Sequence, residues 1–472
     1  MFHNLIKLPY SSSSVRFYPS SSVRPEFFYS YKKVSKGIFL IFLFFTLSLC
    51  ATDPIQLTVS SNKQTAMPIA IITNTTSAAM HNIATTIKKD LLFTDQFSPT
   101  IHHMAVDAPK TALADTIKKI SLTTPFALYL NTQADNSITW RLYDTFQGKK
   151  LAGKKYSQKN TLLRATAHRI ADEIVSCLTG NDGFFSSRIV YCKELKNDAN
   201  KIIKHIYIAD FDGSNEELLV ADATISVAPR WNNNLYKPQI FYSEYTDTNV
   251  QLMSIDMQKN KVIASQLDGV TMLANFSPDG EKSVFCASKG KGSCQIYYQT
   301  KDALRPLTHN NGNNDSPVFI DNDHVCFCSD AQTKSPQIYI GNIQTGHIRR
   351  ITKNGYCTSP SYCPKNNTIA YLKKVHNTMQ IFTYDCATKN HTQITYSNEN
   401  KYSVSWSPNG THLMCAKEHL GKSHIISMNL TTKKVHQLTG TDANYSYPHW
   451  SPCYKHFPSV NHKTNRQILS LC

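Results

Sequence analysis

The fold is decided by residues 273–299, which read LANFSPDGEKSVFCASKGKGSCQIYYQ. The Pro-Asp-Gly at residues 278–280 is a hairpin signal, because glycine accepts a positive φ without steric cost. Residues 283–287 alternate as a strand does, and Gly290 and Gly292 mark a second turn before a third strand at residues 295–299. With a fourth strand expected at residues 303–308, the stretch predicts a meander of four short strands.

This unit recurs through the second half of the chain with a nearly constant period. Aromatic residues in related contexts follow one another at intervals of 43 to 45 residues, at Trp231, Phe276, Phe319, Tyr362, Trp406 and Trp450. A second element recurs in phase and begins at His205, Gln251, Gln295, Gln337, Gln380 and His424. Four strands in about 44 residues is the length of one propeller blade, and a blade buries its faces only by stacking on its neighbours.

We therefore predict a mixed chain, with a small N-terminal α/β domain followed by a six-bladed β-propeller over residues 181–472. A β-sandwich would need no such strict period. We expect the strand at Trp450 to close the ring by joining the blade begun by residues 184–220. Seven blades are the alternative, because Gln467-Ile468-Leu469 falls where another third strand would, 43 residues after Ile425.

Residues 52–180 lack the repeat, and their pattern of apolar residues predicts the α/β domain. Residues 68–73 (PIAIIT) form an apolar run typical of a buried strand. Apolar residues then recur at helical spacing from Met80 to Leu91, and again from Leu162 to Leu178, before Gly180 as a stop. Strands are expected at Phe126–Leu130 and Ile138–Tyr143.

Residues 1–51 predict an export signal. Lys32, Lys33 and Lys36 precede twelve apolar residues, IFLIFLFFTLSL at 38–49, which suit a signal peptide better than a membrane span. We expect cleavage after Ala51, a periplasmic mature chain, and no stable membrane span after processing. The alternative is a lipoprotein acylated on Cys50, although Leu49 is bulky for that processing.

The formal net charge is +17, of which the leader carries +5, so the remainder is strongly basic and favours acidic partners. No dense Lys/Arg run or basic helix is present, and we do not expect nucleic-acid binding. Thirteen cysteines show no zinc spacing and are expected mostly as small buried thiols. Cys286 and Cys294 flank a turn symmetrically, which leaves a cross-strand disulfide as a hypothesis.

Motifs for catalysis are not found, and we predict a non-enzymatic protein without metal or cofactor. The sequence has no GxSxG, HExxH or P-loop. Asp210, Asp212 and Glu216 are attributed to a hairpin turn, because Gly213 comes too early for an EF-hand. Asp172-Glu173 is attributed to a solvated helix face.

Topology places a binding surface at one mouth of the propeller. The loops that lead into the first strand of each blade share a mouth with the loops that join its second and third strands. These loops are rich in Asn, Tyr and His, which suit polar recognition with aromatic anchors. The candidate partner-binding residues are Asp268, His309, Asn311, Asp315, Tyr356, Tyr402 and Tyr445.

Several blocks together resemble the TolB family. They are HRIADEI at residues 168–174, LTG at 178–180, FFSSRIVY at 184–191, DFDG at 210–213 and the SPDG-type turns. The resemblance covers roughly residues 55–452. The long leader, the number of cysteines and the tail after Cys453 depart from the family pattern.

The resemblance implies a periplasmic component of the Tol-Pal envelope system, and we expect the protein to be a monomer. The resemblance also implies that a propeller mouth binds the peptidoglycan-associated lipoprotein Pal and that the mature N-terminus, Thr52, Asp53, Pro54, Ile55 and Gln56, engages TolA. The system supports outer-membrane constriction in cell division and envelope integrity. The alternatives are a secreted propeller hydrolase or lyase, and a peptidoglycan-binding module.

Overall fold

The structure is a computed structural model. It describes residues 66–453 apart from 75–76, 105–111, 134–136, 158–162, 222–224, 266, 268 and 289–291. The predicted export signal and Thr52 to Gln56, the residues expected to engage TolA, lie outside the described residues. Asp268 and the segment Gln467–Leu469, on which the seven-blade alternative rests, also lie outside them.

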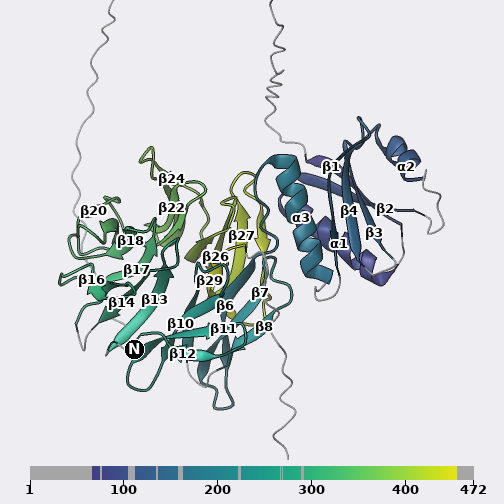
Figure 1. The fold of residues 1–472 in the computed structure, drawn as a ribbon. Helices are drawn as coiled ribbons and strands as arrows, with labels where there is room; N and C mark the ends of the chain where they lie inside the picture. Colours follow the sequence, from purple (N-terminus) through teal and green to yellow (C-terminus); the bar gives the residue numbers. More distant parts are fainter. Residues whose placement is uncertain are drawn as a thin grey trace, which may run out of the picture. The chain divides into compact units, whose positions relative to one another are not determined.

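The N-terminal part is a five-stranded sheet with helices on both faces (Figure 1). Its strand order is β2-β1-β3-β4-β5, parallel where β1 meets β2 and β3 and antiparallel from β3 to β5. In chain order its elements are β1 (Met67–Thr73), α1 (Ala78–Phe93), β2 (Phe97–His103), α2 (Ala112–Ile120), β3 (Phe126–Thr132), β4 (Ile138–Asp144), β5 (Lys149–Tyr156) and α3 (Leu163–Thr179).

The two helices predicted from apolar spacing are α1 and α3, and both pack on one face of this sheet. Ser77 begins α1 as its N-cap, with its hydroxyl accepting from the Met80 N–H at 3.3 Å. Gly180 follows the end of α3 with φ +71°, the left-handed conformation that glycine adopts most easily. On the other face α2 buries Ile117. The mixed fold predicted for this segment is confirmed.

The rest of the described chain consists of four-stranded antiparallel units, as the repeat predicts. One unit joins β29 (Asn444–Trp450) to β6 (Arg188–Lys196), β7 (Ile202–Asp210) and β8 (Glu217–Val220). Next come β9 (Ile225–Trp231), β10 (Gln239–Tyr245), β11 (Val250–Asp256) and β12 (Lys261–Ile263), and then β13 (Val270–Phe276), β14 (Ser283–Ser288), β15 (Gln295–Gln299) and β16 (Leu304–Pro306). Short parallel pairings at β7–β9 and β11–β13 link these three units into one sheet.

The three remaining units are separate four-stranded sheets. They are β17 (Asn314–Phe319), β18 (His324–Ser329), β19 (Gln337–Asn342) and β20 (Ile348–Arg350); β21 (Cys357–Cys363), β22 (Thr368–Val375), β23 (Thr378–Asp385) and β24 (His391–Gln393); and β25 (Asn400–Trp406), β26 (His412–His419), β27 (Lys422–Asn429) and β28 (Val435–Gln437). Apolar clusters between neighbouring units form the core of the propeller.

The strand at Trp450 pairs with the first strand after the α/β part, as expected. Asn444 lies opposite Glu194, and Trp450 lies opposite Ile189. The indole N–H of Trp450 donates to the Ser187 hydroxyl at 2.8 Å, and the Ser451 hydroxyl accepts from the Arg188 N–H at 2.9 Å. Two segments more than 250 residues apart are therefore held in one unit.

The strands that begin the units, β9, β13, β17, β21, β25 and β29, are here called the inner strands, and each carries a β-bulge. Each bulge has a non-glycine residue at positive φ three positions before the repeated aromatic, at Ala228, Leu273, Ser316, Ser359, Ser403 and Tyr447. The left-handed conformation costs about 1–2 kcal/mol at such residues. Neighbouring strands therefore have to impose it.

Candidate functional site: the propeller channel and its two ends

A cavity of about 1360 Å³ lies between the inner strands and α3. At the end where the inner strands begin, which we call the front mouth, its wall includes Cys294, Asn313 and Asp315. At the opposite end the wall includes Arg169 and Glu173 of α3. The cavity is therefore a channel with a polar rim at each end.

Glutamine side chains from the third strand of three units hold loops of the front mouth. The amide of Gln295 donates to the carbonyls of Asn310 at 2.8 Å and Gly312 at 3.2 Å, and the amide of Gln380 donates to the Ser397 carbonyl at 2.7 Å. Gln337 makes the same contact with the Gly355 carbonyl. The repeated Gln of the sequence therefore has a positional role: it fixes the backbone of the loops that could contact a partner.

Four threonines, which the sequence analysis did not identify, bind the third strand of their units. A threonine hydroxyl accepts from the backbone N–H of the isoleucine that follows the repeated Gln or His, at 2.9 to 3.0 Å. The threonines are Thr308, Thr352, Thr395 and Thr439. An Ile-Thr or Leu-Thr pair every 43 or 44 residues was the signal that could have revealed them.

The structure places some of the predicted partner-binding residues at the surface of the front mouth and others deeper in the protein. His309 and Asn311 are exposed on one loop of the front mouth. Tyr356 is 44% exposed on a second loop, and Tyr402 is 42% exposed near the start of strand β25. Asp315 lies deeper and lines the channel. These five residues remain candidates.

Tyr445 was wrongly placed among the surface anchors, because it is only 1% exposed. It stands five positions before the repeated aromatic, a position that is buried in all the repeats: Ser226, Thr271, Asn314, Cys357, Lys401 and Tyr445. Its hydroxyl donates to Asp442 Oδ1 at 2.6 Å, and the Lys193 ammonium lies 5.4 Å from its ring centre. The tyrosine therefore belongs to the packing between strands.

Asp315 is a largely buried carboxylate whose hydrogen-bonding capacity is only partly used. Its Oδ1 has no hydrogen-bond partner, and burial raises its pKa, with Asp330 adding to the effect. A buried carboxylate that lacks donors is expected to gain from a donor or cation on a bound molecule.

Arg230 gives the channel wall a positive charge that sequence analysis did not single out. Burial lowers its pKa to about 10, and its guanidinium donates to the carbonyl of its neighbour Pro229 at 3.0 Å. It stands directly before the repeated aromatic, where the other units have Asn275, Val318, Ser361, Ser405 and His449. The sequence could have revealed Arg230 as a candidate, because it is a charged residue at a repeat position that is otherwise uncharged.

The attribution of Asp172 to a solvated helix face was wrong. Its side chain binds the backbone of the segment that connects α3 to β6. Its carboxylate accepts from the backbone N–H groups of Phe185 at 2.7 Å and Ser186 at 3.0 Å. Burial raises its pKa to about 6, although these bonds oppose the change. The partly buried Glu173 beside it bonds Lys154 and Tyr156.

The acidic turn after β7 pairs with cations rather than forming an acidic cluster of its own. Arg164 of α3 contacts Asp210 at 2.7 Å and Asp212 at 2.8 Å, and Lys193 lies 3.2 Å from Glu216. The hairpin turn expected here is present, and it joins the propeller to α3.

Beside this turn, a buried histidine links the two parts of the chain. His168 Nδ1 lies 2.7 Å from Asp90 Oδ2, and its Nε2 lies 3.7 Å from Asp210 Oδ2. Burial alone would lower the pKa of His168, but the two carboxylates raise it to about 9. The imidazolium therefore bridges α1 and the propeller at neutral pH.

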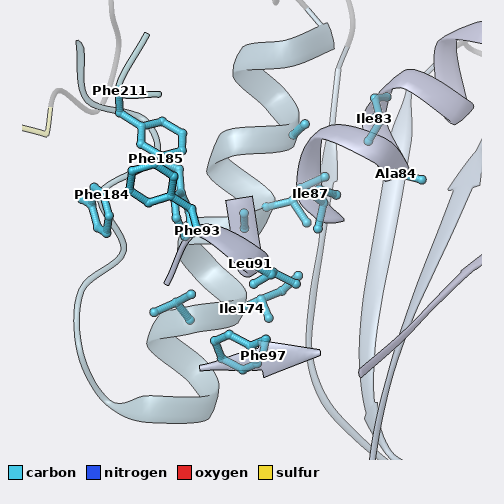
Figure 2. Packing of buried hydrophobic residues seen from close by; sticks show 14 of the residues in the cluster. Ile83, Ala84, Ile87, Leu91, Phe93, Phe97, Ile174, Phe184, Phe185 and Phe211 are labelled. Carbon is cyan, nitrogen blue, oxygen red and sulfur yellow. The ribbon is translucent and has the colours of Figure 1, made fainter. Parts of the chain in front are cut away.

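Aromatic packing surrounds this bridge. Phe93 at the end of α1 meets Phe184, Phe185 and Phe211 in one cluster (Figure 2). The Phe93 ring stacks on His436 with centres 4.3 Å apart, and the Asn429 amide donates to the Thr94 carbonyl at 2.9 Å. The α/β part and the propeller therefore share one core.

Within the described part of the chain, no helix combines the length and the apolar character needed to cross a membrane.

The fold and the channel define the class: a β-propeller with an N-terminal α/β domain packed against it. The sequence profile described as TolB beta propeller domain matches residues 175–454, more than half of the chain. The crystal structure of TolB from Acinetobacter baumannii has the same fold, with a TM-score of 0.69 and 21% identity, covering 82% of this chain and 97% of that one. The chain belongs to the TolB family.

Curated relatives agree with this assignment. The Tol-Pal system protein TolB of Rickettsia canadensis is 29% identical over 270 residues, which is 53% of this chain and 58% of the relative. The protein of the same name from Rickettsia prowazekii is 33% identical over 154 residues, 32% of this chain and 34% of the relative. The matched part of this chain thus spans between about a third and just over half of those proteins.

His168→Asn is predicted to remove a stabilisation that depends on pH. The folded pKa of about 9 exceeds the ordinary value of 6.5, so the bridge stabilises fully below pH 6.5 and its contribution disappears as pH rises through 9. The free energy of unfolding, measured by urea titration from pH 6 to 9.5, should differ from that of the unmodified chain by roughly 3 kcal/mol at pH 6 and by much less at the alkaline end.

His412→Asn is the matched control at the same junction. Burial and the nearby His436 lower the pKa of His412 to about 4, so it stays neutral across this range. Its substitution should cost the same at every pH tested. A difference for His168→Asn that does not change with pH would contradict the charged bridge.

Proposed function

We propose that this protein is a periplasmic, non-enzymatic component of the Tol-Pal system that binds Pal at the front mouth and TolA through its mature N-terminus. In this role it supports outer-membrane invagination during division and envelope integrity. The observation that carries the proposal is the TolB-family propeller together with a polar mouth built from anchored loops.

The front mouth has the composition of a protein-binding surface. Partly exposed Tyr356 and Tyr402 supply aromatic area, exposed His309 and Asn311 supply polar contacts, and Asp315 lies at the channel wall. Aromatic anchors surrounded by polar groups are typical of interface hot spots. Because the loops are fixed by the repeated Gln and Thr, little ordering is needed on binding, which favours affinity.

The hydrolase or lyase alternative has less support. Glycoside cleavage commonly needs two carboxylates facing the same bond. Of the carboxylates in the described channel wall, Asp172 holds backbone N–H groups, Glu173 bonds Lys154 and Tyr156, and Asp182 bonds Lys365. Asp315 is left without a carboxylate partner for such chemistry, so we favour binding over catalysis.

The variant H309A/D315N/Y356A is predicted to weaken Pal binding by about tenfold or more, equivalent to at least about 1.4 kcal/mol. It removes a polar contact and an aromatic anchor from loops of the front mouth, and a carboxylate from the adjoining channel wall. The measurement is the Kd for Pal by isothermal titration calorimetry. An unchanged Kd would exclude this mouth as the Pal site.

Tyr236→Ala serves as the matched control. Tyr236 is 95% exposed and lies in the loop between β9 and β10, at the opposite end of the inner strands. Loss of this ring should leave the Kd for Pal unchanged. A loss equal to that of the triple variant would instead place Pal at the other end of the channel.

Removal of Thr52–Gln56 from the mature chain is predicted to abolish or strongly weaken TolA capture. The segment precedes the first buried strand and carries one charged residue, Asp53, so the melting temperature should stay nearly constant. Capture is measured by pull-down with immobilised TolA, beside a variant in which five Gly/Ser residues replace the segment. Full capture by both variants would mean that TolA binds elsewhere.

A further inference from the structure

Two thiols project from one face of a hairpin in the channel wall. Strands β14 and β15 pair antiparallel, with Cys286 opposite Ile296 and Ala287 opposite Gln295. Cys294 immediately precedes β15, and the same register continued by one residue sets it opposite Ser288. Because side chains alternate along a strand, Cys286 and Cys294 lie on the same face as diagonal neighbours.

The two thiols share one face of the hairpin and differ in their access to the channel. The Cys286 thiol donates to the Met272 carbonyl at 3.4 Å, and its interaction with Cys294 is the largest cause of the pKa shift of each thiol. Both side chains line the channel, but Cys286 is buried whereas Cys294 is partly exposed. A reagent in the channel therefore meets Cys294 first, with Cys286 directly behind it.

The environment favours Cys294 as the attacking group. The hydrogen bond from the Cys286 thiol, with help from Ser288, lowers the pKa of Cys294 to about 7, although burial opposes this. In contrast, burial raises the pKa of the Cys415 thiol to about 12. Thiolates are the nucleophiles in disulfide exchange, and a pKa near the ambient pH is optimal.

We infer that Cys286 and Cys294 form a modification site, a dithiol that exchanges with an external disulfide to become an intramolecular disulfide. The Cys294 thiolate attacks one sulfur of the external disulfide, giving a mixed disulfide and releasing one thiolate. The Cys286 thiol then loses its proton and attacks Cys294 Sγ, which releases the second thiolate. Two electrons pass to the external disulfide, and it leaves as two thiols.

The site touches the front mouth directly. The Cys294 carbonyl accepts from the Asn314 N–H at 2.9 Å and from its side-chain amide at 3.1 Å, and the Ser293 hydroxyl donates to the Asn311 carbonyl at 2.9 Å. The disulfide would therefore fasten the hairpin that supports residues 309–314. The inference concerns the thiols alone and does not depend on Pal as a partner.

The test is disulfide mapping of the full chain. The chain is incubated with oxidised glutathione, its remaining thiols are alkylated, and it is digested with trypsin without reductant. Cleavage after Lys289 and Lys291 separates residues 283–289 from 292–301 unless a disulfide joins them. We expect one linked species that reductant splits. Cys286 recovered in alkylated form, whatever the state of Cys294, would overturn the inference.

Cys357 and Cys363 provide the matched control, because they have a similar spacing in sequence but not in space. They begin and end the seven-residue strand β21, so they lie about 20 Å apart at the usual rise of a strand. The native chain should link Cys286 to Cys294 and leave this pair unlinked, whereas the chain in urea should form both short loops. Equal native linking of both pairs would reflect unfolding and overturn the inference.

A single substitution tests the order of attack. In Cys286→Ser the resolving thiol is gone, so the glutathione adduct on Cys294 should accumulate. In Cys294→Ser, Cys286 should stay unmodified, since it is buried. Glutathione on Cys286 in the second variant, with none on Cys294 in the first, would contradict the proposed roles.

Discussion

The pairing of β29 with β6 is the constraint on which the rest of the structure depends. It joins residues 444–450 to residues 189–194, so that a segment near the end of the described chain completes the unit begun next to the α/β part. Each unit is apolar on both faces and can bury them only against neighbours. When the ring of units is closed, the first and the last unit each pack against a neighbour. The hydrogen bond from the Trp450 indole to the Ser187 hydroxyl lies where the two ends of the propeller meet.

The same constraint shapes the channel. Neighbours on both sides hold each inner strand, which allows a bulge with a residue at positive φ to persist in every one of them. In each inner strand, the residue five positions before the repeated aromatic is buried. The residue that follows it lines the channel in three of the units, at Met272, Asp315 and Thr358. Local backbone geometry therefore decides which side chains a bound partner could meet.

Much of the fold could be predicted from the sequence, because periods of 44 and of 3.6 residues are visible in the order of apolar and turn residues. The four-stranded units, α1, α3 and the pairing of the Trp450 strand all follow from those periods. The candidate site was harder to predict. A bulge shifts the face on which later residues lie, so the burial of Tyr445 is not visible in composition. The roles of Asp172 and Arg230 depend on contacts between distant segments, which periodicity does not encode.

The most direct test of closure is native-state hydrogen exchange of the backbone amides in β29. Protection reports the free energy of the opening that exposes each amide, and a strand fixed into a closed ring opens only with its neighbours. The amides of residues 444–450 that pair with β6 should exchange as slowly as those of β6 and β7. If they exchange as fast as the loops while β6 and β7 stay protected, the ring is not closed by this strand, and the channel and its mouth would have to be redefined.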